Sequence, residues 1–538
     1  MSTVREVTYE LLRELKLTEI FGNPGSTELP FLRDMPGDFK YFLGLHERSA
    51  AGIALGYAMG LGKAAFVNLH SVASVGNGLS AIIDAHHNHV PLVVTSGQQD
   101  RRQVPAEPFL VSRAVEVVKP YVKWACEPLR PEDVPAAIAR GYYIAMQPPM
   151  GPVFISIPMD DWTHECEPTK IRNVSSGVCA EPSALDEVCH VLDSSQTPAL
   201  VVGAQIEEDH AFQQVLALAE HLNADVFQEP IASRWSFPRR HKLFRGSLLP
   251  AQRPLAEQLA GYDTVVVLGA PVFLYYSYVP GNPIRPGTKL FQITNSPADA
   301  AAALAGASIV GNLAAAAEYL LKHTQQHQRQ TPASHNSPPQ PNADAPITAA
   351  FLFSVLNRLM PSDAIIMEEC PSSKGDLDRY LFLDQPQSFY SVRSGILGFG
   401  VPAAIGLQLA HPQRRVICPV GDGSIQYSIQ ALWTAVHYNV PVIFIALCNS
   451  DYSALKAFCD FTQVGRNVPG MELPGIDIAG IARGYGMKAV SVDRPEDLEP
   501  ALKAAFAVQE PHLISVTIAG NTDKCMGMDQ SVNPPKYR

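Results

Sequence analysis

The sequence contains no long hydrophobic run and no recognisable targeting segment at its start. A membrane-spanning helix needs about 20 consecutive apolar residues, and no uninterrupted stretch approaches that length. The opening residues MSTVREVTYELLRELK are charged and helical in pattern, unlike those of a signal peptide. We therefore expect a cytoplasmic protein that makes no membrane contact.

The sequence also has fewer basic than acidic residues and no closely spaced cysteine pair of the CxxC type. The formal net charge is −11, and nonspecific nucleic-acid binding depends on a basic surface, so we expect no nucleic-acid partner. The nine cysteines are scattered, odd in number and include no CxxC pair. This pattern is typical of reduced thiols in a cytosolic protein rather than of disulfides or zinc sites.

Two breaks in composition divide the chain of 538 residues into three parts of similar size. Residues 323–346 are polar and proline-rich, as a linker is, and a softer break lies near residues 175–188. Each part alternates short Val- and Ile-rich runs with Ala-rich helical patterns, which predicts parallel strands buried on both faces. The predicted fold class is therefore α/β, with three doubly wound domains that contain parallel sheets. The predicted boundaries are 1–180 for an N-terminal domain, 181–330 for a central domain, 331–346 for a linker and 347–538 for a C-terminal domain.

One acidic residue stands where a phosphate-binding turn is expected. The apolar run RRVICPV ends in Gly-Asp-Gly-Ser, and Gly423 and Ser424 begin a predicted helix that includes SIQALWTAVHYN. A helix start suits phosphate, but Asp422 would repel phosphate unless a cation lies between them. The next apolar strand ends at Asn449, so the Asp422 and Asn449 side chains should emerge at neighbouring strand ends. Such oxygen ligands, completed by phosphate oxygens and water, suit Mg²⁺ or Ca²⁺.

The GDG motif with its spaced asparagine resembles the signature of thiamine diphosphate (ThDP) enzymes. Further segments along nearly the whole chain are similar to those of the ThDP-dependent 2-keto acid decarboxylase family, and in particular to its benzoylformate decarboxylases. These segments are FGNPGSTELPF, FVNLHS, TSGQQ, GAPVF, GFGVPAAIG and VPGIDI. The resemblance implies a pyrimidine-binding, a central and a diphosphate-binding domain. It also implies a homo-oligomer, with a dimer of dimers as the family precedent, whose active sites are shared between subunits.

The resemblance implies a role for each residue that matches a family motif. Asp422 and Asn449 would bind the metal through their side chains, and Asp451 through its backbone oxygen. Glu47, in GLHERSAAG, matches the glutamate that shares a proton with the aminopyrimidine ring of the cofactor. Leu397 matches the apolar wedge that bends the cofactor. The other implied cofactor contacts are Ser372, Gly395, Gly423, Ser424 and Tyr452.

The substrate side of the site follows the family motif less closely. Ser26 and His70 match the polar groups that bind the substrate carboxylate and orient the keto group. Tyr276 stands where the resemblance places a second catalytic histidine, and a phenol with a pKa near 10 is a poorer proton shuttle at neutral pH than imidazole. Ser391 replaces a large aromatic residue of the pocket, and Arg393 replaces a small one. The residues implied to line the substrate pocket are Ser391, Ala454, Leu455 and Phe458.

The resulting hypothesis is a Mg²⁺-dependent decarboxylation of an aromatic, benzoylformate-like 2-keto acid to an aldehyde and CO₂. A carboligase or C–C lyase that forms or cleaves 2-hydroxyketones is the second enzymatic interpretation, and Tyr276 favours it because it slows protonation after CO₂ is lost. A noncatalytic binding protein with the ThDP fold is a third interpretation, which the joint presence of Glu47, His70, Asp422 and Asn449 disfavours. An acetohydroxyacid-synthase-like enzyme would contain FAD, which we do not expect and which yellow colour would reveal.

Overall fold

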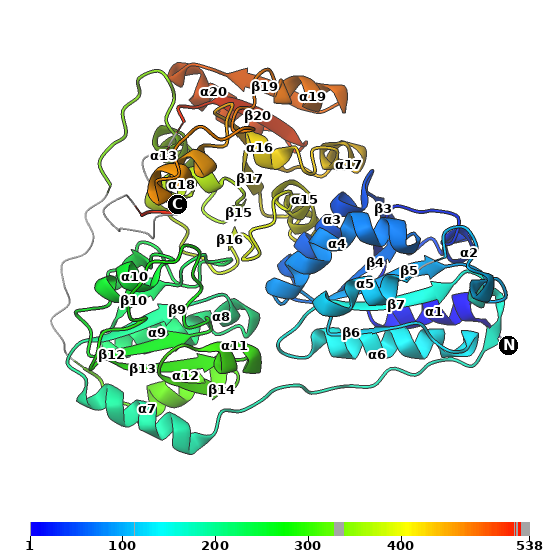
Figure 1. The fold of residues 1–538 in the computed structure, drawn as a ribbon, viewed down its shortest axis with the longest axis horizontal. Helices are drawn as coiled ribbons and strands as arrows, with labels where there is room; N and C mark the ends of the chain where they lie inside the picture. The colour runs from blue at the N-terminus through cyan, green and yellow to red at the C-terminus, as the bar shows by residue number, and fades with distance from the viewer. Residues whose placement is uncertain (1, 112, 328–337, 521, 523–525, 529–538) are drawn as a thin grey trace.

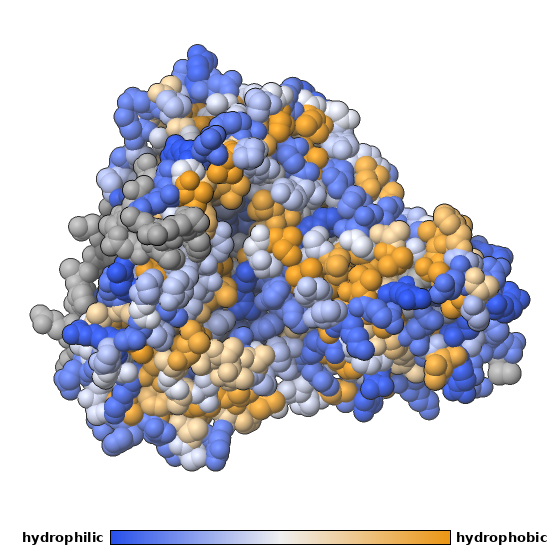
Figure 2. Space-filling model, viewed as in Figure 1, coloured by the Kyte–Doolittle hydropathy of each residue, from blue (hydrophilic) through white to orange (hydrophobic). Residues whose placement is uncertain are grey.

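The computed structural model describes residues 2–111, 113–327, 338–520, 522 and 526–528. Within these residues the chain forms three domains, each built on a six-stranded parallel sheet with helices packed around it (Figure 1). The predicted α/β fold class with three doubly wound parallel sheets is confirmed. Figure 2 shows that this face of the molecule is hollowed where the three domains meet, and that hydrophobic residues gather on the first domain beside the hollow.

The first sheet has the strand order β3-β2-β4-β5-β7-β6. Its apolar runs are buried as predicted, because helices cover both faces. The strands are β2 (Glu19–Gly22), β3 (Lys40–Leu43), β4 (Ala65–Leu69), β5 (Leu92–Gln98), β6 (Trp124–Cys126) and β7 (Val153–Pro158). The helices are α1 (Val4–Glu14), α2 (Leu29–Leu32), α3 (Glu47–Leu61), α4 (Ser71–His87), α5 (Ala114–Val118) and α6 (Val134–Met146). A short antiparallel pair, β1 (Ser2–Thr3) and β8 (Glu165–Cys166), joins the two ends of this domain.

The central sheet has the order β11-β10-β9-β12-β13-β14 and its own hydrophobic core. The strands are β9 (Pro198–Val202), β10 (Asp225–Gln228), β11 (Phe244–Ser247), β12 (Thr264–Leu268), β13 (Lys289–Thr294) and β14 (Ala307–Val310). The helices are α7 (Pro182–Ser194), α8 (Gln205–Glu208), α9 (Phe212–Leu222), α10 (Gln252–Gln258), α11 (Pro297–Ala302) and α12 (Leu313–His323).

The third sheet has the order β16-β15-β17-β18-β20-β19, which places β17 and β18 side by side at its centre. The strands are β15 (Ile365–Met367), β16 (Phe389–Tyr390), β17 (Val416–Gly421), β18 (Ile443–Cys448), β19 (Lys488–Val492) and β20 (His512–Thr517). The helices are α13 (Ala349–Leu359), α14 (Lys374–Tyr380), α15 (Gly400–Ala410), α16 (Asp422–Ile425), α17 (Ala431–His437), α18 (Ser453–Thr462), α19 (Ile478–Gly484) and α20 (Pro495–Phe506).

One sequence prediction about this domain is wrong. A continuous helix was expected after Gly423, but the structure has two short helices, α16 and α17, separated by residues 426–430. The backbone there forms tight turns, such as the four-residue turn closed by the hydrogen bond from the Tyr427 N–H to the Ser424 carbonyl. Tyr427 packs so closely on Gly398 that a Cβ atom at Gly398 would lie 2.5 Å from the Tyr427 Cβ. This tertiary contact interrupts a segment that helical propensity alone would have made a continuous helix.

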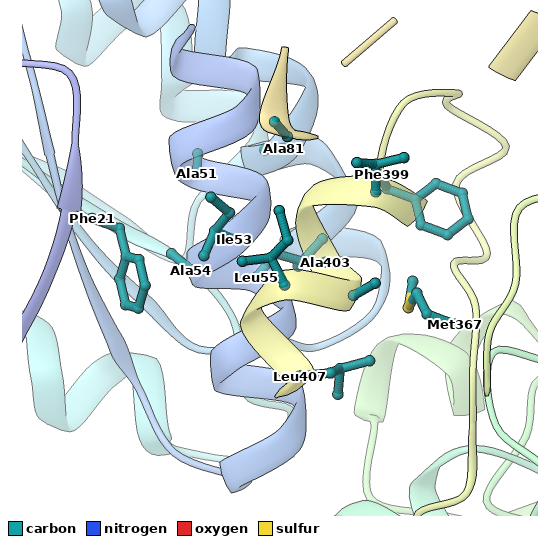
Figure 3. Packing of buried hydrophobic residues seen from close by; sticks show 14 of the residues in the cluster. Phe21, Ala51, Ile53, Ala54, Leu55, Ala81, Met367, Phe399, Ala403 and Leu407 are labelled. Atoms are coloured by element: carbon teal, nitrogen blue, oxygen red, sulfur yellow. The ribbon is translucent and has the colours of Figure 1, made fainter. Parts of the chain in front are cut away.

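Helices α3 and α15 pack the first domain against the third in a single core (Figure 3). Their backbones cross at two glycines. A Cβ atom at Gly56 would lie 2.0 Å from the Ala403 carbonyl oxygen, and one at Gly406 would lie 2.0 Å from that of Ile53. Only glycine permits this approach. The crossing holds the start of α3, where Glu47 lies, in a fixed relation to the third domain.

The predicted linker and the C-terminal tail lie partly outside the described residues. Of the linker, residues 331–337 are not described, and residues 338–346 form no helix or strand. Of the tail, residues 525 and 529–538 are not described, while Met528 is buried against Ala457 and Phe461 of α18. Within the described part of the chain, no helix is long and apolar enough to cross a membrane.

Candidate functional site

The adjacent ends of β17 and β18 carry the predicted metal-binding side chains. Asp422 follows β17 directly, and its two carboxylate oxygens accept hydrogen bonds from the Gly423 N–H at 2.9 Å and the Ser450 N–H at 2.7 Å. Burial raises the pKa of the Asp422 carboxyl, and these backbone hydrogen bonds oppose the rise. Asn449 follows β18, and its amide donates to the Ser453 hydroxyl at 3.0 Å. The structure therefore brings Asp422 and Asn449 to neighbouring strand ends, as the sequence predicts.

The carboxylate of Asp451 is engaged elsewhere. Its Oδ2 atom lies 2.7 Å from the Lys456 ammonium, and the Ser453 hydroxyl donates to its Oδ1 atom. Lys456 also contacts Glu472 at 2.6 Å, which holds the lysine in place. With its charge paired in this way, the Asp451 side chain is not directed to a metal ion, which agrees with a backbone role at that position.

The oxygen set at this sheet edge suits a hard divalent cation. It consists of the Asp422 carboxylate, the Asn449 amide and nearby backbone, and it is chemically different from a cluster of acidic or histidine ligands. Among the residues that the structure describes, no group of three or more His, Cys, Asp or Glu side chains is placed to hold a metal. A cation bound here would need further oxygens from a ligand, such as a diphosphate, and from water.

The residues predicted to contact a diphosphate surround the same strand ends. Ser424 lies in α16, beside Gly423, where a Cβ atom would lie 2.5 Å from the Tyr452 ring. Glycine is therefore required for Tyr452 to pack there. The Ser372 hydroxyl accepts from the Ala454 N–H of α18 at 3.1 Å, so its proton is free to donate to a ligand.

The loop that is predicted to hold an aminopyrimidine is anchored by a buried glutamate side chain. Gly395 and Gly398 adopt φ angles of +71° and +95°, which favour glycine. Glu369 accepts hydrogen bonds from the N–H groups of Gly398 and Gly400, the second at 2.5 Å. Burial raises the pKa of Glu369 to about 8. These hydrogen bonds fix the backbone that directly follows the half-buried Leu397.

A buried ion pair holds the same loop from the first domain. Arg48 lies 2.6 Å from Asp84, and the two side chains are 4% and 0% exposed. Arg48 also donates to the Leu397 carbonyl at 3.3 Å, and the Ser394 hydroxyl donates to Asp84. The pair therefore connects α3 and α4 to the loop of the third domain.

Replacing Asp84 with alanine should destabilise the protein strongly. The change leaves the buried Arg48 charge without a partner, and breaking a buried pair from one side typically costs about 3–5 kcal/mol. The midpoint of urea unfolding measures the loss. The exposed pair of Arg13 and Asp38 provides the control, because Asp38→Ala should shift the midpoint very little. The double variant Arg48→Met/Asp84→Ala should recover most of the lost stability, and an equally low midpoint would contradict this explanation.

On the first domain, Glu47 begins α3 and is 7% exposed. Its carboxylate accepts hydrogen bonds from Ser74 at 2.7 Å, Asn77 at 2.9 Å and Asn23 at 3.2 Å. Burial by itself raises the pKa of Glu47, but the hydrogen bonds from Ser74, Asn77 and Asn23 outweigh it and leave the pKa lowered. Glu47 is therefore ionised at neutral pH inside a largely buried site.

His70 follows β4 and is the N-cap residue of α4. Its Nδ1 atom lies 3.0 Å from Glu28 Oε2 and 2.8 Å from Thr27 Oγ1. The hydrogen bond with Glu28 is the main cause of the raised pKa of His70. Ser26 is exposed and directly precedes Thr27. The structure thus places His70 against Thr27 and Glu28, the two residues that follow Ser26.

The predicted pocket residues come from two domains. Tyr276, which belongs to the central domain, contacts Phe458 of α18 edge-to-face with ring centroids 5.7 Å apart. Tyr276 is 56% exposed, and Leu455 on the same helix is 47% exposed. Ser391 is instead 7% exposed, and its hydroxyl donates to Glu368 at 3.0 Å. The position where the resemblance places an aromatic ring thus holds a buried, hydrogen-bonded polar pair.

Four residues with evident structural roles at the site were missed from the sequence: Glu28, Arg48, Asp84 and Glu369. Arg48 offered the clearest signal, because it is a charge near the start of an Ala- and Gly-rich helix and would need a buried partner. Glu369 lies two residues after an apolar strand, and Glu28 lies in the same short motif as Ser26. Glu28 and Glu369 could each also be a solvent-exposed acid at a helix start, so the sequence did not distinguish that role from a buried structural one.

The fold and the site together define a ThDP-dependent enzyme. The chain has three parallel α/β domains, with a buried, ionised glutamate on the first and an Asp–Asn pair at strand ends on the third. Comparisons with known proteins agree. Models of thiamine pyrophosphate enzymes match the chain at residues 2–115 for the N-terminal TPP binding domain, 185–320 for the central domain and 372–516 for the C-terminal TPP binding domain. The chain belongs to the thiamine pyrophosphate enzyme family, and ThDP is its cofactor.

Comparisons with individual proteins show which members of this family the chain resembles. The chain is 42% identical to a benzoylformate decarboxylase of Pseudomonas aeruginosa, over 96% of this chain and 99% of the relative. A 4-hydroxybenzoylformate decarboxylase of Rhodococcus jostii RHA1 has a structure with a TM-score of 0.94 and 40% identity, over 97% of this chain and all of that one. A benzoylformate decarboxylase of Polynucleobacter necessarius gives a TM-score of 0.95 and 38% identity, over 97% and 99%. The predicted resemblance to ThDP-dependent 2-keto acid decarboxylases, and hence to a carboxy-lyase, is confirmed.

Proposed function

We propose that the protein converts an aromatic 2-keto acid to an aldehyde and CO₂ without net oxidation, using ThDP and Mg²⁺. The observation that carries the proposal is the group on the first domain, where an ionised Glu47 and a carboxylate-bound His70 lie on neighbouring helices α3 and α4. When bound, ThDP supplies a thiazolium carbon that attacks the keto carbon and accepts the electron pair left as CO₂ departs. The remaining tasks fall to side chains of this chain.

Glu47 would share a proton with the aminopyrimidine ring, and its lowered pKa keeps it ionised at neutral pH and able to accept that hydrogen bond. Mg²⁺ would be held by Asp422, Asn449 and the backbone of Asp451. The diphosphate would be contacted by Ser372, Gly423, Ser424 and Tyr452, and the pyrimidine by Gly395 and Leu397.

On the substrate side, Ser26 would donate a hydrogen bond to the substrate carboxylate. His70 would orient the keto oxygen and move protons at its Nε2 atom.

The pocket composition supports an aromatic substrate that carries a polar ring substituent. Phe458, Leu455 and Ala454 offer apolar contacts, while Ser391 and Glu368 form a buried polar pair. The relatives named above act on benzoylformate and 4-hydroxybenzoylformate. A panel of 2-keto acids with ThDP and Mg²⁺, assayed for CO₂ and aldehyde, tests the proposal. Turnover of pyruvate alone, with neither aromatic acid consumed, would contradict it.

We also propose a cytoplasmic dimer or dimer of dimers with shared active sites. The hydrogen-bond partners of Glu47 lie in the first domain, and those of Asp422 lie in the third. Each half is thus complete within its own domain, as pairing across subunits requires. Light scattering of the purified protein measures the assembly, and an active monomer would contradict the shared site.

A carboligase is the second candidate, favoured by the contact of Tyr276 with Phe458. If Tyr276 stands where a proton-donating histidine would act, the carbon left after CO₂ loss is protonated slowly, and an added aldehyde can trap it as a 2-hydroxyketone. CO₂ release in the first turnover should then precede aldehyde release.

Tyr276→His should shorten this delay, because imidazole titrates near pH 6.5 and phenol near pH 10. Rapid quench measures CO₂ and aldehyde in the same reaction. Tyr278→His is the matched control, because Tyr278 is an exposed tyrosine two positions away. Equal delays in the wild type and in Tyr276→His would remove the reason to favour carboligation.

A further inference from the structure

The His70 ring is held by two neighbours that the proposed chemistry does not use. On one side is the backbone of Gly25, where a Cβ atom would lie 2.2 Å from the ring carbon Cγ. The second neighbour is Glu28, which is 1% exposed and lies 3.0 Å from Nδ1. Because Nδ1 faces Glu28, only the other ring nitrogen, Nε2, is left to contact a ligand.

The hydrogen bonds of Glu28 determine which His70 nitrogen carries the proton. Its Oε1 atom accepts from the Gly97 N–H at 3.0 Å and from the Thr27 hydroxyl at 2.6 Å. Its Oε2 atom accepts from the Gly25 N–H at 3.0 Å and also faces His70 Nδ1. Both oxygens of Glu28 already accept hydrogen bonds from these groups, so the side chain acts as an acceptor here and Nδ1 donates to it.

Thr27 reinforces the same arrangement. Its hydroxyl proton is directed to Glu28 Oε1, so its oxygen offers a lone pair to the Nδ1–H group 2.8 Å away. Glu28 and Thr27 therefore both accept from Nδ1. In neutral His70 the proton lies on Nδ1 and the lone pair on Nε2, and in protonated His70 the Nε2–H group becomes a donor.

We propose that Glu28 is the positioning residue for His70: it fixes the tautomer and the ring orientation, so that Nε2 alone exchanges protons with the substrate. Glu28 acts through His70 and does not touch the substrate. A carboxylate on the far nitrogen plays this part for metal-binding histidines, where its loss typically costs about 10–100-fold in affinity or activity. The inference rests on the substrate role proposed for His70.

The first test measures His70 without catalysis. Diethyl pyrocarbonate reacts with neutral imidazole, so labelling of the His70 peptide, followed by mass spectrometry over a pH series, reports the pKa of His70 in the holoenzyme. The raised pKa of His70 places the labelling midpoint above that of an ordinary histidine. Glu28→Gln should lower the midpoint, because the carboxylate charge that favours protonated His70 is lost. An unchanged midpoint would overturn the proposal.

Glu127→Gln is the matched control for this labelling. Glu127 is also a hydrogen-bonded glutamate of the first domain, and it accepts from Ser156 at 2.7 Å. Its substitution should leave the His70 midpoint where the wild type has it. An equal fall in both variants would show a nonspecific effect and would overturn the assignment to Glu28.

The second test is a double-mutant cycle on kcat/KM. Glu28→Gln should lower kcat/KM about 10–100-fold in the wild-type background and have little further effect in the His70→Ala background. An equal penalty in both backgrounds would show a purely structural role. If Glu28→Gln does not fold, Glu28→Asp serves instead, because it keeps the charge and shortens the reach. Full activity of His70→Ala alone would refute the proposed role of His70, while the labelling result would still decide whether Glu28 controls its pKa.

Discussion

Asp422→Ala should abolish activity by releasing the metal and the diphosphate together. Asp422 offers a carboxylate at the end of β17, and the Ser450 N–H ties it to the end of β18. Without that charge, the diphosphate would face the sheet edge with its bridging cation weakly held. A loss of about 3 kcal/mol corresponds to at least a hundredfold weaker ThDP binding. Isothermal titration with ThDP in the presence of Mg²⁺ measures the change.

Asp451→Asn is the matched control for this experiment. Its carboxylate is already paired with Lys456, so the substitution removes a charge from the same edge and keeps the backbone carbonyl. ThDP affinity should fall far less than in Asp422→Ala. If Asp422→Ala binds ThDP as the wild type does, the assignment of the metal to Asp422 is wrong.

Glu47→Gln should leave ThDP bound and slow the exchange of the thiazolium proton. The amide is the same size but cannot share the proton of the aminopyrimidine ring, and loss of an acid–base partner typically costs about 10²–10⁴-fold in rate. Quenched hydrogen–deuterium exchange followed by NMR measures the exchange rate in the holoenzyme. An exchange rate equal to that of the wild type would exclude this role for Glu47.

A control separates charge from packing at the same place. Asn77→Ala removes one of the hydrogen bonds that lower the pKa of Glu47 and keeps the carboxylate. The pKa of Glu47 should rise, so the exchange rate should begin to fall at a higher pH as the solution is acidified. At neutral pH its exchange should stay much faster than that of Glu47→Gln.

Local pattern was enough to predict the three sheets and the neighbouring strand ends that carry Asp422 and Asn449. Val- and Ile-rich runs separated by helices have few ways to bury both faces except in parallel sheets. The spacing of Asp422 and Asn449 predicts neighbouring strand ends because it leaves room for one crossover connection. The broken helix after Asp422 escaped prediction, because the contact between Tyr427 and Gly398 joins residues far apart in sequence.

The sequence by itself determined the fold class, the family motif and the residue types at the predicted metal and cofactor positions, since each depends on order and spacing along the chain. Only the tertiary structure decided which charges are paired. Asp451 is occupied by Lys456, Arg48 is buried with Asp84, and His70 is held by Glu28. The environment of a charge depends on neighbours brought together by packing, and it controls the pKa and the direction of each hydrogen bond.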